Sequence, residues 1–194
     1  MAKYQINYEA LDEDKNKKNG TPYQELLEWV ETIIFAFFAV ILIFTFLLRQ
    51  ASVDGDSMNP TLRDGEKLIV NHLGYEAEAG DIVIIDCGDE LGKAIVKRVI
   101  ATEGQTVDID FESGEVRVDG ELLEEDYIAE LTLTDEGGHS YPVTVPDGCV
   151  FVMGDNRNNS LDSRSSLISF VDEDDILGKV VFRIYPFEKI GTVE

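Results

Sequence analysis

Cysteine, histidine and positive charge are all scarce in this chain of 194 residues. The two cysteines, Cys87 and Cys149, are too few for a disulfide scaffold or for a zinc site with four cysteine ligands. The 16 lysines and arginines are outnumbered by 39 aspartates and glutamates, which gives a net charge of -23. Because a polyanion would meet a surface of like charge, and no long basic cluster is present, the composition argues against nucleic-acid binding.

The sequence also lacks any fixed-period repeat, and its 16 glycines and 5 prolines are ordinary numbers. These absences exclude collagen, a coiled coil and wholesale disorder. The length allows one modest domain with a core of its own, or one domain with an appendage. Because Cys87 and Cys149 each adjoin an apolar strand, both a disulfide and two buried thiols remain open.

One long apolar run is present: Thr32 to Leu48 contains no charged residue. It is near the minimum length for crossing a bilayer core of ~30 Å, and Trp29 and Val30 extend it. A core helix that is apolar on every face would need a larger protein around it, and a cleavable signal peptide would have a shorter apolar region. We therefore predict a transmembrane anchor helix at 25–49, after a flexible tail at 1–24. The bases on its two sides balance, so charge leaves its orientation open.

From residue 50 onward, short apolar runs alternate with turn signals, and no segment keeps a helical period over ten or more positions. Thr106–Phe111 alternates cleanly, and Asp119-Gly120 is typical of a two-residue hairpin turn. We predict a mainly β domain at 50–194, with further strands at Lys67–Asn71, Asp81–Asp86, Ala94–Thr102, Pro142–Val145, Cys149–Met153 and Lys179–Tyr185.

Ser57 is the first residue that suggests chemistry. It lies among turn residues directly after the apolar run and is followed by Met58 and a rigidifying Pro60. This is a weak signal by itself, since serine-rich turns are common. Ser57 is eight residues beyond Arg49, so even an extended link keeps it within ~29 Å of the end of the predicted anchor.

Lys97 is the second residue that suggests chemistry. It lies in Ala94–Ala101, which is apolar at six of eight positions, and strand alternation places it between Ile95 and Val99 on one face. Burial among aliphatic side chains lowers a lysine pKa from its usual ~10.4, so that the neutral amine can act as a general base. A structural lysine paired with a carboxylate, or one whose head reaches solvent, is the alternative.

The polar loop Gly154–Arg164 is the third feature that suggests a functional site. A calcium loop is excluded because Ser160 and Ser166 stand where glycine and glutamate would be needed. We interpret the loop as a rigid, hydrogen-bonded support for a site. His72 and His139 lie in ordinary polar contexts and are expected at the surface, so no Ser-His-Asp triad is indicated and a Ser-Lys dyad is favoured.

Together these segments resemble the bacterial type I signal peptidases, membrane-bound serine proteases that remove signal peptides from exported proteins. The single anchor and short domain are similar to the Gram-positive members. The matching blocks occur in family order after the anchor: Ser57-Met58-Asn59-Pro60-Thr61-Leu62, Gly80-Asp81-Ile82-Val83, Lys97-Arg98-Val99-Ile100, and Gly154-Asp155-Asn156-Arg157 with Ser160, Asp162, Ser163 and Arg164.

The resemblance implies roles for five residues. Ser57 would be the nucleophile and Lys97 the general base of a reaction through an acyl-enzyme. Ser160 would hydrogen-bond the lysine amine, and Asp162 would pair with Arg164 to hold the loop. The N-terminus would be cytoplasmic and a signal-peptidase-like β domain extracytoplasmic. Signal peptides would be the substrates, the lipid bilayer and export machinery would lie nearby, and no metal or organic cofactor would be needed.

The family pattern also implies small residues one and three places before the cut, in shallow pockets for which Met58, Leu62 and Ile95 are the candidates. Gly55 replaces a hydroxyl residue that some members carry, beside the Ser57 N–H that would bind the oxyanion. Because a serine there would add a donor, we expect Gly55→Ser to be tolerated, with kcat equal or higher. Ala101-Thr102-Glu103-Gly104 replaces a commoner Gly-Leu-Pro-Gly turn.

Two rival interpretations remain at this point. A self-cleaving Ser-Lys repressor-type protease would share the β fold and the dyad, but it would not need the anchor and would carry a DNA-binding segment. A membrane-tethered β module acting as a receptor or scaffold would need neither Ser57 nor Lys97.

Overall fold

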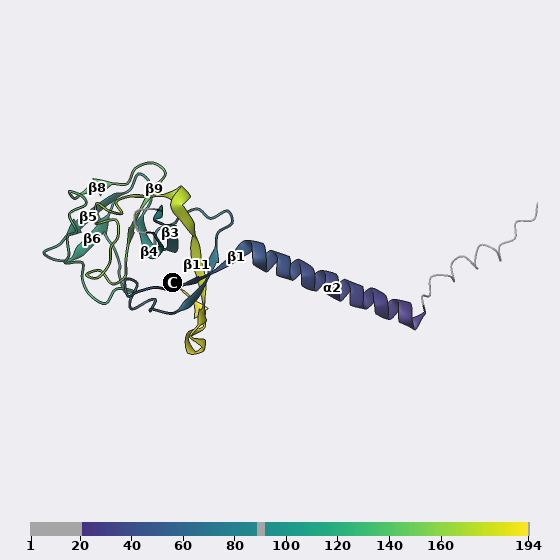
Figure 1. Cartoon of the computed structure of the whole chain (residues 1–194). Coiled ribbons are helices and arrows are strands. Elements are labelled where there is room, and N and C mark those ends of the chain that lie inside the picture. Colours follow the sequence, from purple (N-terminus) through teal and green to yellow (C-terminus); the bar gives the residue numbers. More distant parts are fainter. Residues whose placement is uncertain (1–20, 89–91, 194) are drawn as a thin grey trace, which may run out of the picture. The chain divides into compact units, whose positions relative to one another are not determined.

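The computed structural model describes residues 21–88 and 92–193, so most of the predicted tail at 1–24 lies outside the described residues. The chain divides into two compact units between Phe46 and Leu47. Helix α2 makes the described part of the first unit, and a β domain makes the second (Figure 1).

Helix α2 (Pro22–Leu47) begins with a favourable N-terminal sequence. Pro22 occupies the first turn, where its missing N–H costs nothing, and the Gln24 side chain accepts a hydrogen bond from the Thr21 N–H. The helix begins three residues before the predicted anchor, and at Leu48 the chain becomes a strand. The side chains of residues 43–48 lie outside the described part. Judged on the described residues, no helix meets the length and apolar character needed to cross a membrane.

In the described part of the second unit, an eight-stranded sheet has the order β1-β2-β11-β3-β4-β9-β10, with β12 paired to β11, and a four-stranded sheet has the order β7-β6-β5-β8. The strands of the larger sheet are β1 (Leu48–Ser52), β2 (Lys67–Asn71), β3 (Ile82–Asp86), β4 (Ala94–Ala101), β9 (Cys149–Met153), β10 (Val171–Asp172), β11 (Ile176–Tyr185) and β12 (Gly191–Thr192). Those of the smaller sheet are β5 (Thr106–Asp110), β6 (Glu115–Val118), β7 (Glu121–Leu122) and β8 (Val143–Thr144). The neighbouring strands pair antiparallel.

The prediction of a mainly β domain is confirmed. Strands β2 and β9 have the predicted bounds, and β3, β4 and β5 differ from the prediction by one residue at an end. Asp119 and Gly120 link β6 to β7 with φ of 53° and 83°, the left-handed geometry that a tight hairpin turn needs. Strands β1, β10 and β12 were not predicted.

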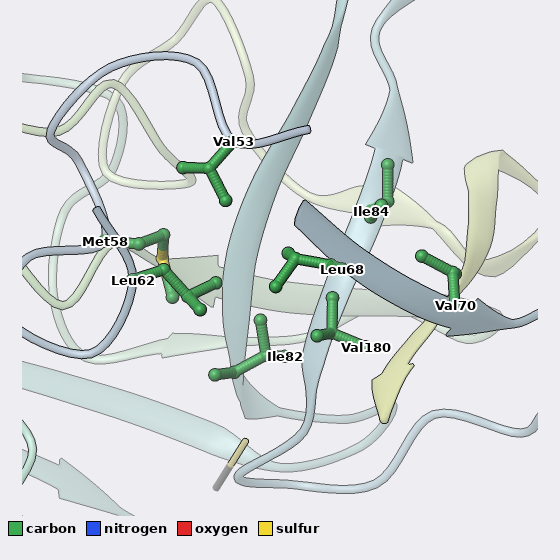
Figure 2. Packing of buried hydrophobic residues seen from close by; sticks show 8 residues of the cluster. All are labelled: Val53, Met58, Leu62, Leu68, Val70, Ile82, Ile84 and Val180. Atoms are coloured by element: carbon green, nitrogen blue, oxygen red, sulfur yellow. The ribbon is translucent and has the colours of Figure 1, made fainter. Parts of the chain in front are cut away.

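The larger sheet is buried on both faces around β3. Ile82 and Ile84 belong to one apolar cluster, while Val83 and Ile85 belong to another on the opposite face, as strand alternation requires. In the first cluster the segment that carries Ser57 supplies side chains to the core (Figure 2). Its members are Val53, Met58, Leu62, Leu68, Val70, Ile82, Ile84 and Val180. The backbone on either side of Ser57 is therefore packed rather than free.

The two cysteines and two histidines have structural surroundings. Cys87 and Cys149 are half-buried, and no disulfide joins them in the described structure. The expectation that both histidines lie at the surface was wrong. The His139 ring is half-buried, with its centroid 4.6 Å from that of Phe170, and His72 is half-buried as well. Aromatic packing draws His139 inward despite its polar sequence neighbours.

Candidate active site

The fold brings Ser57 and Lys97 into contact. Ser57 lies in the turn after β1, and Lys97 lies in the middle of β4. Lys97 Nζ donates a hydrogen bond to Ser57 Oγ at 2.8 Å and another to the Val96 carbonyl at 3.0 Å. A hydroxyl directly against an amine is the geometry that proton transfer between them requires.

Lys97 occupies a buried position. In the antiparallel register it is opposite Val83, which is fully buried, and Lys97 itself is only 3% exposed. Its head therefore does not reach solvent. Among the described residues, no carboxylate forms a salt bridge with Lys97. Within the described residues, Lys97 is therefore neither a lysine paired with a carboxylate nor one whose head reaches solvent.

Burial has an electrostatic consequence for this amine. Loss of solvation disfavours the ammonium and lowers the pKa of Lys97 from 10.5 to about 8. The negative charges of Asp162 and Asp155, among others, act in the opposite direction and keep the pKa from falling further. At pH 7 about a tenth of the amine is therefore neutral, against less than about one part in a thousand at the ordinary pKa.

The polar loop 154–164 holds the Ser57 turn at two points of its backbone. The Asn156 N–H donates to the Ser57 carbonyl at 2.9 Å, and Asn156 Nδ2 donates to the Asp56 carbonyl at 3.0 Å. Thr61 Oγ1 donates to Asp155 Oδ2 at 2.5 Å, a third link to the same loop. The position of the serine is thus set by a loop about a hundred residues further along the chain.

Asp155 also joins the loop to β4 through Arg98, the residue after Lys97. Arg98 donates through Nε and Nη2 to the two carboxylate oxygens of Asp155, at 2.9 and 2.8 Å. Both side chains are almost wholly buried, and the Tyr127 ring stacks on Arg98 with the guanidinium carbon 4.0 Å from the ring centroid. Sequence reasoning missed this pair. The available signal was an arginine in a strand apolar on both faces, since such an arginine is buried only with a partner.

Asp162 and Arg164 lie together inside the loop. Arg164 Nε and Nη2 donate to the two carboxylate oxygens of Asp162, at 2.8 and 2.9 Å, and neither side chain is exposed. Asp162 Oδ2 also accepts from the Gly154 N–H at 2.9 Å. Arg164 Nη2 donates to the Arg157 carbonyl at 2.6 Å. The pair therefore ties the two ends of the loop to each other.

Ser160 differs from the expectation. The resemblance implied a hydrogen bond to the Lys97 amine, but within the described structure the buried Ser160 hydroxyl has no hydrogen-bond partner. The Lys97 amine is directed to Ser57 and to the Val96 carbonyl instead. Ser160 is nevertheless close to the dyad. A Cβ on Gly154 would meet Ser160 Oγ and lie 2.5 Å from the Ser57 carbonyl oxygen, so only glycine fits there.

A cleft of about 350 Å³ lies against the dyad. Residues 52–58 and 93–97 line it, together with Asn159 and Leu161. Of the predicted pocket residues, Met58 and Ile95 are part of the lining, whereas Leu62 is fully buried in the core and does not line the cleft. No group of three or more histidine, cysteine or acidic side chains is arranged for a metal ion in the residues described.

Gly55 lines the same cleft in a conformation that the sequence did not reveal. Its φ is +91°, and its N–H donates to Asp64 Oδ1 at 2.9 Å. Although a Cβ added to this residue would have no atom within 4 Å, the backbone itself disfavours a side chain. The expectation that serine is tolerated at this position is therefore corrected.

We expect Gly55→Ser to lower the free energy of unfolding by about 1–2 kcal/mol, because L residues are strained at this φ. Thermal melts would measure the loss, and kcat should fall as the Ser57 turn shifts. Gly191→Ser is the matched control, since Gly191 also has open space around it but no positive φ. Equal melting temperatures for the two variants would contradict the strain argument.

Comparison with known proteins shows the family of this chain. The family model for signal peptidase, peptidase S26, matches residues 26–185, which is most of the chain. The chain therefore belongs to the signal peptidase family, the class of serine proteases that its site indicates.

Individual relatives make the identification narrower. Signal peptidase I of Bacillus licheniformis is 40% identical over 196 residues, covering 94% of this chain and 98% of that protein. The probable signal peptidase I-1 of Synechocystis sp. is 36% identical over 190 residues, covering 92% of each. A crystal structure of a signal peptidase I from Enterococcus faecalis V583 is 29% identical and covers 54% of this chain and 97% of that chain, with a TM-score of 0.44. The predicted signal peptidase I of Gram-positive type is confirmed.

Proposed function

We propose that this signal peptidase removes the signal peptides of exported preproteins with Ser57 as its nucleophile and Lys97 as its general base. The observation that carries the assignment is the 2.8 Å contact between the buried amine and the serine hydroxyl, at the wall of a cleft. Family membership supports the reaction, and the contact supports the choice of Ser57 and Lys97.

In the first half of the reaction, neutral Lys97 takes the proton from Ser57 Oγ as this oxygen attacks the scissile carbonyl carbon. The Ser57 N–H is the natural donor to the oxyanion that develops. The protonated amine of Lys97 then gives its proton to the departing nitrogen. The C–N bond breaks, the mature protein leaves with a new N-terminus, and the signal peptide stays as an ester on Ser57.

In the second half, Lys97 takes a proton from water, and the resulting hydroxide attacks the ester carbonyl. The C–O bond to Ser57 breaks, the proton returns to Ser57 Oγ, and the signal peptide leaves with a free carboxyl group. The same amine therefore serves both halves, and one water is consumed for each peptide bond cut. Ser160, Asp162 and Arg164 would support the geometry without contacting the scissile bond.

We further propose that residues 25–49 anchor the enzyme in the membrane, with the tail at 1–24 in the cytoplasm and the catalytic domain at 50–194 outside. The uncharged run Thr32–Leu48 supports this, as does the exposure of the large apolar side chains of α2 from Ile33 to Leu42, which favours an apolar medium around them. Preproteins would then be cut at the membrane surface, close to the export machinery.

The direct test is incubation of the purified full chain with a preprotein, comparing wild type with Ser57→Ala. We expect the wild type to release the signal peptide and the variant to release none. Cleavage by Ser57→Ala at the wild-type rate would overturn the assignment of the nucleophile.

The same assay would test the substrate pocket. A substrate with alanine directly before the cut should have a kcat/KM about tenfold or more above that of a substrate with phenylalanine there, because a shallow apolar pocket excludes added bulk.

The reaction should depend on pH through Lys97. Because the base acts only when it is neutral, and its pKa is about 8, kcat/KM should rise about tenfold per pH unit below pH 8 and level off above it. Initial rates on a peptide without titratable groups would measure this profile. A rate that stays flat from pH 6 to pH 10 would exclude a lysine base.

A further inference from the structure

Two opposite charges meet across the cleft that holds the dyad. Lys93 Nζ lies 3.2 Å from Asp54 Oδ2, and both residues line the cleft. Asp54 belongs to the segment that leads to Ser57, and Lys93 lies just before β4, which carries Lys97. The ion pair therefore joins the two sides of the cleft.

The pair contributes little to the fold. The side chains of Lys93 and Asp54 are 58% and 81% exposed, and an ion pair so exposed is weakened by solvent and salt. Neither residue is part of the apolar core. Its position in the cleft, rather than its contribution to stability, is what distinguishes this pair.

Its place along the cleft follows from the chain. Asp54 is three residues before Ser57, and Lys93 is four residues before Lys97. Along β4, at about 3.3 Å per extended residue, Lys93 lies roughly 13 Å from Lys97. The turn before Ser57 keeps Asp54 within about 11 Å of the serine. The apolar lining residue Ile95 lies between Lys93 and Lys97. If the small residues before the cut occupy that apolar stretch, the pair lies beside the substrate residues three to five places before the cut.

We propose that Asp54 and Lys93 determine the charge preference of this signal peptidase at the substrate residues three to five places before the cut. Paired, the two side chains neutralise each other, so this end of the cleft accepts uncharged residues and favours neither sign. Unpaired, either side chain would select a substrate residue of opposite charge. This inference rests on the proposed function, since it assigns a part of the same cleft.

The test uses the full chain and a series of signal-peptide substrates with lysine, glutamine or glutamate at the third, fourth or fifth place before the cut. The measured quantity is the ratio of kcat/KM for the lysine substrate to that for the glutamate substrate. We expect Lys93→Gln to raise the ratio and Asp54→Asn to lower it, each by about two- to fivefold at low salt. The exchange Asp54→Lys with Lys93→Asp should return the ratio to the wild-type value.

Glu115→Gln and Arg117→Gln are the matched controls. They break another exposed ion pair, of 2.7 Å, in the smaller sheet and away from the cleft, and should leave the ratio unchanged. Raised salt should shrink the shifts in the Lys93 and Asp54 variants. Ratios that stay at the wild-type value in both variants would overturn the proposal, as would equal shifts in the controls. Failure of the wild type to cut even the glutamine substrates would instead count against the proposed function.

Discussion

Lys97→Arg is expected to be folded and inactive, with kcat/KM lower by about 10⁴- to 10⁶-fold. Arginine keeps a positive charge at all accessible pH values, so it cannot accept the proton of Ser57. The expected loss comes from chemistry and not from substrate binding. Single-turnover kinetics would separate the two, and circular dichroism would report the fold.

Lys179→Arg is the matched control for this change. Lys179 is partly exposed and pairs with Asp81 on the same sheet, so exchange of its ammonium for a guanidinium should leave activity in place. Substantial cleavage by Lys97→Arg would exclude the lysine-base mechanism.

The burial of Lys97 is also expected to lower the free energy of unfolding of the domain. A folded-state pKa of about 8 against 10.5 means that the unfolded chain holds the proton more tightly. Stability therefore rises with pH between about 8 and 10.5, and at neutral pH the burial costs on the order of 3 kcal/mol. A Lys97→Met enzyme should be inactive yet more resistant to urea than wild type at pH 7, with the difference vanishing above pH 10.5.

The second large effect is expected for Asp162→Asn, which should lower the free energy of unfolding by about 3–5 kcal/mol. Asp162 and Arg164 are fully buried, and removal of the Asp162 charge leaves the buried guanidinium with only the more distant Glu136 carboxylate, 3.9 Å away. The 2.9 Å contact between Asp162 and the Gly154 N–H would weaken as well, which should displace the turn that carries Ser57 and lower kcat.

Urea unfolding and kcat would measure both consequences of Asp162→Asn. Glu115→Gln gives the baseline for an exposed pair, where the loss should not exceed about 1 kcal/mol. A second variant, Asp162→Leu with Arg164→Met, removes both charges and should recover part of the stability without recovering kcat. A single variant as stable as Glu115→Gln would show that the pair does not hold the loop.

Local patterns in the sequence were sufficient to predict the strands whose buried side chains are alternate or consecutive apolar residues. β2 and β9 were predicted with their observed bounds because each carries its own hydrophobic pattern. β10 and β12 have two residues each and depend on pairing with β9 and β11. Neither β10 nor β12 has a period of its own, and the sequence did not indicate them.

The candidate site also has features that the sequence indicated and others that depend on tertiary structure. The apolar neighbours of Lys97 indicated a buried position but left open a lysine paired with a carboxylate or reaching solvent. Its closeness to Ser57 followed only from the family resemblance, since 40 residues separate them. The Arg98–Asp155 pair and the positive φ of Gly55 depend on tertiary structure. The hydroxyl of Ser160 shows the limit of carrying a role over from relatives, because here it makes no hydrogen bond to the lysine amine in the described structure.

The position of β11 has a consequence for how the enzyme becomes active. β2 and β3 follow each other in the sequence, yet β11 lies between them in the sheet and pairs with both. The half of the sheet that follows the Ser57 turn and the half that carries Lys97 are thus joined by a strand that comes after both of them in the sequence. Contacts of such long sequence separation form late and slowly. We therefore expect the Ser57 turn and Lys97 to reach their final positions only after β11 has been synthesised and has paired with both β2 and β3.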